Sequence, residues 1–367
     1  MFINKKNLIM FMPTIDTGGV EKNFIIISNH FAITYKNVSV ITTSAFCKNK
    51  FSKKINFITQ NLINLQNMSR RSKFAIALLI LFKELILNKN NLVFCFQANL
   101  YCILLCKILN TKIIVRSNSS PTGWSSNNIK KYLYKVILRL ADKIVVNSLE
   151  FKKVFKKKFN IDVECVYNPL NKKNVLKLSK KKIKFNFFNK KNINFINVSR
   201  LETQKDHFTL LKSLKNIHYD YKLLLIGNGS KKVDIERYIK NHNLSENIKI
   251  LSNIDNPFPY IKKADYLILS SIYEGLPNIL LEAIVLKKLI ISSDCPTGPK
   301  EILDNGRGGI LFKTGNHQDL IKKLNSLKKD YKINKKKMRF AFKRINRFDY
   351  NEKLLEYTKL TTKFLTN

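Results

Sequence analysis

The segment from Asp265 to Ser293 reads DYLILSSIYEGLPNILLEAIVLKKLIISS and decides the fold class. Its two ends, Asp265–Ser270 and Leu289–Ser293, are short apolar runs of strand length. The stretch between them, from about Pro277 to about Leu286, is nearly apolar all round, and proline is well suited to the first turn of a helix. A strand, a buried helix and a second strand in this order predict a βαβ unit of a parallel sheet.

The same alternation runs along the rest of the chain. Several of the apolar runs are continuous rather than alternating, which is typical of strands buried on both faces of a parallel sheet. We therefore expect an α/β protein with two doubly wound, Rossmann-like domains. The other predicted strands are Leu8–Met12, Val38–Thr42, Ile55–Ile58, Leu92–Phe96, Lys112–Arg116, Lys143–Asn147, Val163–Tyr167, Ile193–Val198, Lys222–Gly227, Asn247–Leu251 and Gly309–Phe312.

A change of composition marks the domain boundary. After Tyr167-Asn168-Pro169 the chain is rich in Lys and Asn and has no clean period. We expect a first domain over 1–170, a linker over 171–192, a second domain over 193–345, and a C-terminal helix over 346–367 that crosses back to the first domain. The closing segment predicts two helices that are broken near residues 347–350.

The composition indicates which kinds of binding partner to expect. The chain has 367 residues, enough for two domains, and 67 Lys and Arg against 25 Asp and Glu, a formal net charge of +42. Such an excess favours anionic partners: nucleic acid, an anionic membrane surface or phosphorylated ligands. The alternative is a compositional bias, because Lys, Asn and Ile are abundant throughout, as in a protein encoded by an AT-rich genome. A hydrophobic content of 45% argues against global disorder.

Signals for metals and membranes are weak. Six cysteines and five histidines form no zinc pattern, and there is no D-x-D pair, so we expect reduced cysteines, a cytosolic protein and no metal cofactor. The apolar run at the N-terminus is too short for a signal peptide, and no segment reaches the length of a membrane span. The apolar segment 74–87 follows Arg70 and Arg71, which predicts either a helix on a membrane surface or a buried core helix.

Several motifs follow predicted strands, where open α/β sheets bind ligands. With two such domains facing each other, we expect the site in the cleft between them. Gly18 and Gly19 follow the first strand, where they either permit close approach of a ligand or form an ordinary turn. Arg200 and Lys205 follow the first strand of the second half, where two cations suit a diphosphate. Gly227 opens a GxG turn, which is weak evidence for a nearby nucleotide.

Two glutamates stand out in the opening segment, Glu274 before the predicted helix and Glu282 on it. A carboxylate in an apolar segment is costly unless something donates hydrogen bonds to it. One explanation is a ligand whose hydroxyls meet the carboxylates while a phosphate sits at the helix start, near residues 275–278. The alternative is that a Lys or Arg from elsewhere in the chain neutralises each glutamate.

The stretch Glu274 to Glu282, EGLPNILLE, resembles the E-x7-E signature of retaining, nucleotide-sugar-dependent glycosyltransferases of family 4, which have the GT-B fold. Stretches 255–265 and 295–302 resemble the branch that builds bacterial surface polysaccharides and lipid-linked oligosaccharides. The resemblance covers nearly the whole chain and is strongest over 194–312. The other matching motifs, in the family's order, are Gly18-Gly19-x-Glu21, Tyr167-Asn168-Pro169, Ser199-Arg200-Leu201 with Lys205-Asp206, and Ile226-Gly227-x-Gly229.

The resemblance implies a reaction and a set of roles. A hexose or N-acetylhexosamine would move from a nucleotide sugar, a UDP-sugar, to a lipid-linked or glycan acceptor, with retention of configuration and without a metal. Arg200, Lys205 and Glu274 would be the catalytic residues, the two cations on the diphosphate and the glutamate on the donor sugar. Glu282 would bind the ribose hydroxyls. The remaining donor contacts would come from Gly18, Gly19, Gly227, Ile254 near the base, Gly275, Leu276, Pro277, Asn278 and Ile279.

One departure concerns the acceptor side, which the resemblance places in the first domain. Many relatives carry a histidine after the strand that corresponds to Lys112–Arg116, whereas this chain has no histidine between His30 and His207. Arg116 and Asn118 are the candidates to take its place, with Glu21 also on the acceptor side. The basic, apolar segments at 70–87 and 130–143 would suit an acceptor on the cytoplasmic face of an anionic inner membrane.

Two other functions stay open at this point. A non-catalytic relative would bind a nucleotide sugar without transferring it. A basic nucleic-acid-binding protein would be driven by charge. The cations are dispersed, however, and no helix-turn-helix, zinc finger or RNP-like aromatic motif is present, so we expect no nucleic-acid partner.

Overall fold

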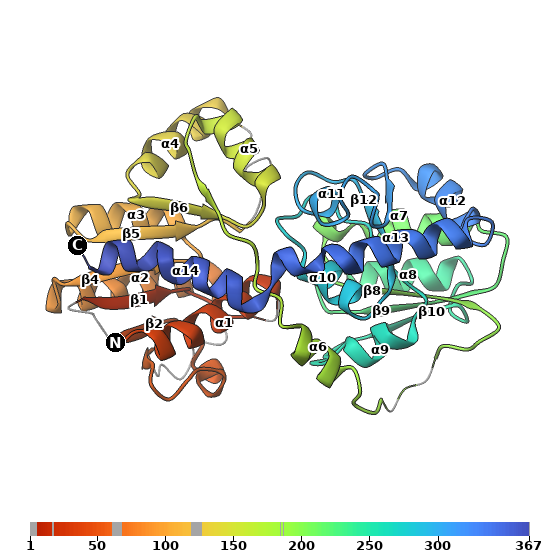
Figure 1. The fold of residues 1–367 in the computed structure, drawn as a ribbon, viewed down its shortest axis with the longest axis horizontal. Helices are drawn as coiled ribbons and strands as arrows, with labels where there is room; N and C mark the ends of the chain where they lie inside the picture. The colour runs from red at the N-terminus through yellow and green to blue at the C-terminus, as the bar shows by residue number, and fades with distance from the viewer. Residues whose placement is uncertain are drawn as a thin grey trace. The chain divides into compact units, whose positions relative to one another are not determined.

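The computed structural model describes residues 6–16, 18–60, 68–118, 127–183, 185 and 187–366. The chain divides into two compact units, one of Met1–Pro169 with Asn351–Asn367 and one of Leu170–Tyr350. Each unit is built on one parallel sheet flanked by helices (Figure 1).

The first unit holds a seven-stranded sheet in the order β3-β2-β1-β4-β5-β6-β7. Its strands are β1 (Asn7–Phe11), β2 (Val38–Ile41), β3 (Asn56–Ile58), β4 (Asn91–Cys95), β5 (Lys112–Arg116), β6 (Lys143–Val146) and β7 (Glu164–Cys165). Its helices are α1 (Gly19–Thr34), α2 (Arg70–Leu87), α3 (Asn99–Ile108), α4 (Asn128–Arg139), α5 (Leu149–Phe159) and α14 (Tyr350–Leu365), with a 3₁₀ turn at Ala45–Lys50.

The side chains of β4 show how this sheet is covered on both faces. Val93 and Cys95 face a core that they share with buried residues of α2, α3, α4 and α5. Phe94 points to the opposite face, because successive side chains of a strand alternate. There its ring meets Phe31 of α1 and Tyr357 of α14. The last helix of the chain therefore packs into the first unit.

The second unit holds a six-stranded sheet in the order β10-β9-β8-β11-β12-β13. Its strands are β8 (Ile193–Val198), β9 (Tyr221–Ile226), β10 (Ile248–Leu251), β11 (Tyr266–Leu269), β12 (Leu289–Ser293) and β13 (Ile310–Phe312). Its helices are α6 (Lys172–Leu178), α7 (His207–Leu214), α8 (Lys232–Asn241), α9 (Phe258–Lys263), α10 (Asn278–Val285), α11 (Pro299–Ile302), α12 (His317–Asn325) and α13 (Tyr331–Arg344), with 3₁₀ turns η4 (Thr203–Lys205) and η5 (Ile345–Phe348).

The predicted elements agree closely with these bounds. Each predicted strand overlaps one strand of the structure, and the closing helices are interrupted by η5 as expected. Two details differ. The stretch 171–192, predicted as a linker, begins with α6, whose first turn is capped by the side chain of Asn171. Pro277 is the N-cap residue of α10 rather than a residue of its first turn.

Candidate active site

The site is built where the second sheet reverses its winding direction. From β8 the chain continues to β9 on one side, whereas β11 pairs with β8 on the other side. All of these strands are parallel, so the loops after β8 and after β11 leave the same edge of the sheet side by side. Such a switch point is where open α/β sheets bind ligands. Arg200 and Lys205 lie in the loop after β8, and Glu274 lies in the loop after β11.

Hydrogen bonds join these two loops. The Ser270 hydroxyl donates to the Lys205 carbonyl at 2.8 Å. The side-chain amide of Gln204 donates to the Tyr273 carbonyl at 2.7 Å, and the Ile272 N–H donates to the Gln204 carbonyl at 2.8 Å. Three bonds over so few residues hold the backbone of the first loop in register with the second.

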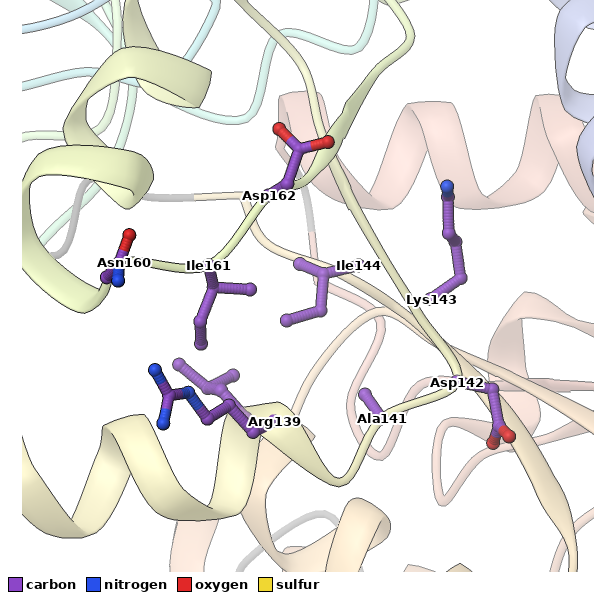
Figure 2. Close-up of a pocket in the computed structure, with 9 residues that line it drawn as sticks. Arg139, Ala141, Asp142, Lys143, Ile144, Asn160, Ile161 and Asp162 are labelled. Atoms are coloured by element: carbon purple, nitrogen blue, oxygen red, sulfur yellow. The ribbon is translucent and has the colours of Figure 1, made fainter.

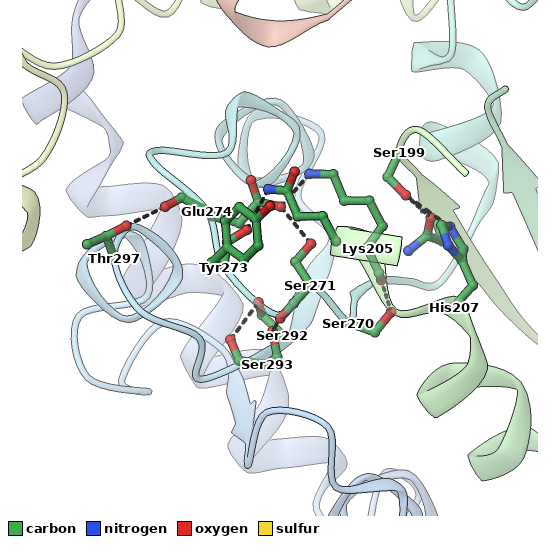
Figure 3. Close-up of polar contacts among 12 residues, drawn as sticks. Ser199, Lys205, His207, Ser270, Ser271, Tyr273, Glu274, Ser292, Ser293 and Thr297 are labelled. Carbon is green, nitrogen blue, oxygen red and sulfur yellow. Dashed lines mark hydrogen bonds and ion pairs between the residues drawn. The ribbon is translucent and has the colours of Figure 1, made fainter. Parts of the chain in front are cut away.

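Lys205 and Glu274 form an ion pair inside this frame (Figure 3). The Nζ atom of Lys205 lies 2.5 Å from Oε1 of Glu274, and the Ser271 hydroxyl donates to the same oxygen at 2.6 Å. The side chains of Lys205 and Glu274 are only 13% and 9% exposed. A cation from elsewhere in the chain therefore neutralises Glu274. Of the two explanations offered for this carboxylate, neutralisation by a Lys or Arg is the one that the structure shows. Glu282 is also buried, on α10.

A third loop, the one after β12, holds Glu274 from the other side. The Thr297 hydroxyl donates to the Glu274 carbonyl, and the Glu274 N–H donates to the Pro296 carbonyl at 3.4 Å. Gly298 has a positive φ of 85°, and a Cβ atom on it would lie 2.2 Å from the Gly275 carbonyl oxygen. Only glycine fits such an approach. The backbone of Glu274 and Gly275 is thus held by residues 296–298 of the loop after β12.

The helix that follows, α10, is buried on nearly every side. Leu276 is buried before it, Ile279 is half-buried in its first turn, and residues 280–285 are all buried. The stretch 275–278, where the sequence indicated a phosphate, leads into the N-terminus of this helix, and all of its residues except Pro277 carry a backbone N–H. Helix N-termini favour anions, because N–H groups and the helix dipole both point there.

Arg200 and Gly227 lie together at the neighbouring strand ends. Arg200 is exposed in the loop after β8. A Cβ atom on Gly227 would lie 1.9 Å from the Ser199 carbonyl oxygen, so the bare glycine permits the turn after β9 to pack on the backbone beside Arg200. The GxG turn that the sequence indicated at Gly227 is thus packed against the protein's own backbone.

Glu202 and Ile254 extend the same edge toward β10. The Glu202 carboxylate accepts hydrogen bonds from the backbone N–H and the hydroxyl of Ser230, at 2.9 and 2.7 Å. These bonds are the main cause that lowers the pKa of Glu202. Ile254 lies half-buried in the loop between β10 and α9. The loops after β8 and β9 are thus tied together, with that of β10 beside them.

His207, the first residue of α7, supports the loop that carries Arg200 and Lys205. The Asn197 amide donates to the Ile268 carbonyl, so its Oδ1 accepts from the Ser199 hydroxyl at 2.7 Å. Ser199 Oγ then accepts from Nε2 of His207, at 3.1 Å. Burial, and then the charge of Lys205, lower the pKa of His207 from 6.5 to about 4. The imidazole is therefore neutral at neutral pH.

The first-unit residues of the predicted site lie in two places. Gly18 is the exposed N-cap residue of α1, Gly19 begins the helix, and Glu21 follows in its first turn. A Cβ atom on Gly18 would lie 2.4 Å from a carboxylate oxygen of Glu21, so the Glu21 side chain folds back over the helix start. These residues follow β1, which pairs with both β2 and β4 at the switch point of the first sheet.

Arg116, by contrast, is fully buried at the end of β5. Its Nε donates to the Tyr357 hydroxyl at 2.9 Å and one Nη to Asn168 Oδ1 at 2.5 Å. The other Nη contacts Asn118 Oδ1, and the Asn118 amide donates to the Phe96 carbonyl at 2.8 Å. In this structure Arg116 joins α14 to the segment that leaves the first unit. An acceptor-side role for Arg116 and Asn118 stays a prediction.

Four of the residues in this arrangement that were not singled out from the sequence hold or support the loops of the site. They are Ser271, Gln204, Thr297 and His207. The signal that pointed to them was weak, since each is only a polar residue in the segment that follows a predicted strand. Among the described residues, no group of three or more His, Cys, Asp and Glu side chains is placed to hold a metal ion. No described helix is long and apolar enough to cross a membrane.

A pocket of about 280 Å³ opens elsewhere in the first unit (Figure 2). It is lined by residues 138–139, 141–144 and 160–162, at the amino-terminal edge of β6. The Asp142 carboxylate there accepts from the Ile113 N–H at 2.8 Å and pairs with Lys107 at 3.0 Å. Its charge is satisfied within the protein, and the edge is opposite to the one where such sheets bind ligands.

Comparisons with known proteins agree with the geometry. Residues 179–344 match the family described as Glycosyl transferases group 1. An uncharacterized glycosyltransferase of Methanocaldococcus jannaschii is 33% identical over 217 residues, which cover 55% of this chain and 53% of that protein. This chain thus spans about half the length of the archaeal relative.

A second relative is aligned over almost its whole length. It is the GalNAc-alpha-(1->4)-GalNAc-alpha-(1->3)-diNAcBac-PP-undecaprenol alpha-1,4-N-acetyl-D-galactosaminyltransferase of Campylobacter jejuni, 25% identical over 361 residues, with 95% of this chain and 96% of that protein covered.

Among solved structures, Anabaena HepE in complex with UDP superposes with a TM-score of 0.77 at 15% identity, covering 98% of this chain and 100% of that one. The likeness to such structures confirms the predicted α/β class and GT-B type of fold, with two parallel sheets and alternating helices. Residues 179–344 therefore form a domain of the group 1 glycosyl transferases.

Proposed function

We propose that this protein is a retaining glycosyltransferase that moves a hexose or N-acetylhexosamine from a UDP-sugar to a lipid-linked or glycan acceptor, in the synthesis of a bacterial surface polysaccharide or oligosaccharide. The observation that carries the proposal is the buried Lys205–Glu274 pair at the switch point of a group 1 domain. Two curated relatives from Campylobacter jejuni, named as transferases acting on undecaprenol diphosphate glycans, and the UDP bound to Anabaena HepE support it.

In this proposal the donor is held by the loops described above. Arg200 and Lys205 meet the diphosphate, and the start of α10 adds its amides and its dipole. Glu282 accepts from the ribose hydroxyls. Glu274, fixed by Ser271 and by the clamp on its carbonyl, accepts from hydroxyls of the transferred sugar. In this proposal the Lys205 ammonium holds the Glu274 carboxylate in place and also contacts the phosphate of the bound donor.

The chemistry asks these groups to stabilise a departing anion. The bond between the anomeric carbon and the phosphate oxygen breaks, and an acceptor hydroxyl takes that position on the same face of the sugar. The proton of the hydroxyl passes to the released diphosphate. Fixed cations and amides favour the charge that develops on the diphosphate, without reorganisation during the reaction. The proposal includes no metal, so turnover in EDTA should equal turnover with added Mg²⁺ or Mn²⁺.

Thermal unfolding with UDP-, GDP- and ADP-sugars tests donor binding. A donor at 100 times its Kd stabilises the folded state by about 2.7 kcal/mol, which raises the Tm of a domain of this size by roughly 5–10 °C. We expect this rise with UDP-sugars. Glu282→Gln should abolish it, whereas Glu236→Gln, at an exposed position of α8, should not. A panel without any shift would contradict the proposal.

The products test transfer itself. Purified protein, a UDP-sugar that raises the Tm and a membrane extract as acceptor source should release UDP, and proton NMR of the product should show the donor's anomeric configuration. Donor binding without release of UDP would favour the non-catalytic alternative. Inversion at the anomeric carbon would contradict the assignment as a retaining enzyme.

A further inference from the structure

Apolar side chains gather on one part of the first unit's surface. In the part of the chain that the structure describes, half of the large apolar side chains that are exposed lie on α2, α3 and α4 or directly after α4. The most exposed on each helix include Leu79 and Leu87 on α2, Tyr101 and Ile108 on α3, and Ile129 and Tyr132 on α4, which are 64–79% exposed.

These helices form one continuous surface. Helix α3 packs against both α2 and α4, and all three cover the same face of the sheet (Figure 1). Their inner sides are buried, with Leu81, Ile103 and Leu138 in the shared core. The exposed apolar residues lie on the opposite sides of the same helices, as the helical period requires. We call this surface the α2–α4 face.

The α2–α4 face is also strongly basic. The three helices together carry nine Lys and Arg residues and one acidic residue, Glu84. Exposed cations alternate in the sequence with exposed apolar residues, as Lys83 follows Phe82 and Lys131 precedes Tyr132. Helices that lie in the plane of a membrane interface combine Lys and Arg with Leu, Phe, Tyr and Ile in this way.

The positive charge of the α2–α4 face also discriminates among the partners that could bind it. A two-fold pairing of two copies through this face would bring nine cations against nine cations, because a symmetric interface uses the same patch twice. Nucleic acid would meet the cations but leave the large aliphatic side chains in water. An anionic bilayer satisfies both, since its headgroups attract Lys and Arg while its acyl boundary takes up apolar side chains.

We propose that the α2–α4 face is the surface by which this protein binds peripherally to an anionic lipid bilayer. The side chains of Leu79, Ile108 and Ile129 enter the boundary between headgroups and acyl chains, and the cations lie among the acidic headgroups. The inference rests on the proposed function in one respect, that a lipid-linked acceptor is met at a membrane. Vesicle binding is measured without donor or acceptor, so the membrane-binding proposal and the proposed transfer activity can fail separately.

Vesicle co-sedimentation of the full chain tests this surface. We expect binding to vesicles of phosphatidylcholine with about one third phosphatidylglycerol, and at least tenfold weaker binding to pure phosphatidylcholine. The triple variant Lys130→Glu, Lys131→Glu, Lys135→Glu should lose at least tenfold in affinity for the anionic vesicles. The apolar variant Ile108→Ser, Ile129→Ser should lose at least threefold while the far-UV circular dichroism spectrum is unchanged.

A matched control has the same change of charge in the second unit. Lys332→Glu, Lys336→Glu, Lys343→Glu alters three exposed lysines of α13 and should keep vesicle affinity within twofold of the parent. An equal loss in this control would overturn the proposal, because diffuse charge would then explain binding. So would equal binding to both kinds of vesicle, or self-association in sedimentation velocity that the apolar variant abolishes. The rise in Tm with a UDP-sugar should survive in both face variants.

Discussion

Lys205 and Glu274 are two halves of one buried pair that can be removed separately or together. With Nζ and Oε1 2.5 Å apart, their gross attraction at an effective dielectric constant of about 20 is about 7 kcal/mol, of which desolvation offsets a large part. Lys205→Met leaves the Glu274 carboxylate buried with the Ser271 hydroxyl, and breaking a buried pair in this way costs about 3–5 kcal/mol.

The other variants complete a double-mutant cycle. Glu274→Gln should cost less, about 1–2 kcal/mol, because the long Lys205 side chain is 13% exposed and its ammonium reaches water more easily than the carboxylate does. The double variant Lys205→Met, Glu274→Gln buries no unpaired charge, so its free energy of unfolding should return to within about 1 kcal/mol of the parent.

Urea unfolding followed by circular dichroism measures these differences. With a slope of about 2–3 kcal/mol per molar for a unit of this size, Lys205→Met should lower the urea midpoint by about 1–2.5 M. Sugar transfer should be absent in all three variants, including the double variant whose stability is restored, because the reaction needs both charges. A Lys205→Met variant as stable as the parent would refute the structural role of the pair. Turnover in the double variant would refute its catalytic role.

The remaining predictions concern the support of the site. Burial lowers the pKa of His207 from 6.5 to about 4, so the neutral imidazole contributes fully to the free energy of unfolding above pH 6.5. About 3 kcal/mol of this free energy is lost as the pH falls from 6.5 through 4. The urea midpoint of the parent should therefore fall between pH 7.5 and pH 4.5 by more than that of His207→Gln, which lacks the imidazole. Gly298→Ala should raise the apparent Kd for UDP-sugar at least tenfold, because its Cβ would displace the Gly275 carbonyl, and unchanged binding in a titration would contradict the clamp. Arg116→Met removes three hydrogen bonds of a fully buried side chain and should lower the Tm by several degrees, more than Tyr357→Phe does; equal Tm values for Arg116→Met and the parent would show that the cluster does not stabilise α14.

Strands and helices were predictable because their signals are local. Runs such as Leu289–Ser293 and the apolar helix before it are read within a few residues, and continuous rather than alternating hydrophobicity indicates a parallel sheet. The break between the two closing helices was predicted in the same way. The helix α6 was missed because its surroundings are rich in Lys and Asn, which hide a short apolar period.

The candidate site was predictable in part. Arg200, Lys205 and Glu274 were named because each follows a predicted strand, and the structure brings the loops of all three to one edge of the second sheet. That Lys205 neutralises Glu274 was not predictable, since the two are 69 residues apart and nothing in the local sequence pairs them. The burial of Arg116 was missed for the same reason, because its partner Tyr357 is 241 residues away.

The sequence by itself determined the α/β class, the order of the elements and the loops on which the chemistry-bearing residues lie, since periodicity and turn residues act over short range. The tertiary structure decided which loops are neighbours, because the placement of β11 beside β8 is a property of the whole sheet. That one adjacency supplies Glu274 with its cation. The tertiary structure also decided which sides of α2, α3 and α4 stay exposed. In an apolar helix the exposed side is known only once it is known which side packs into the core.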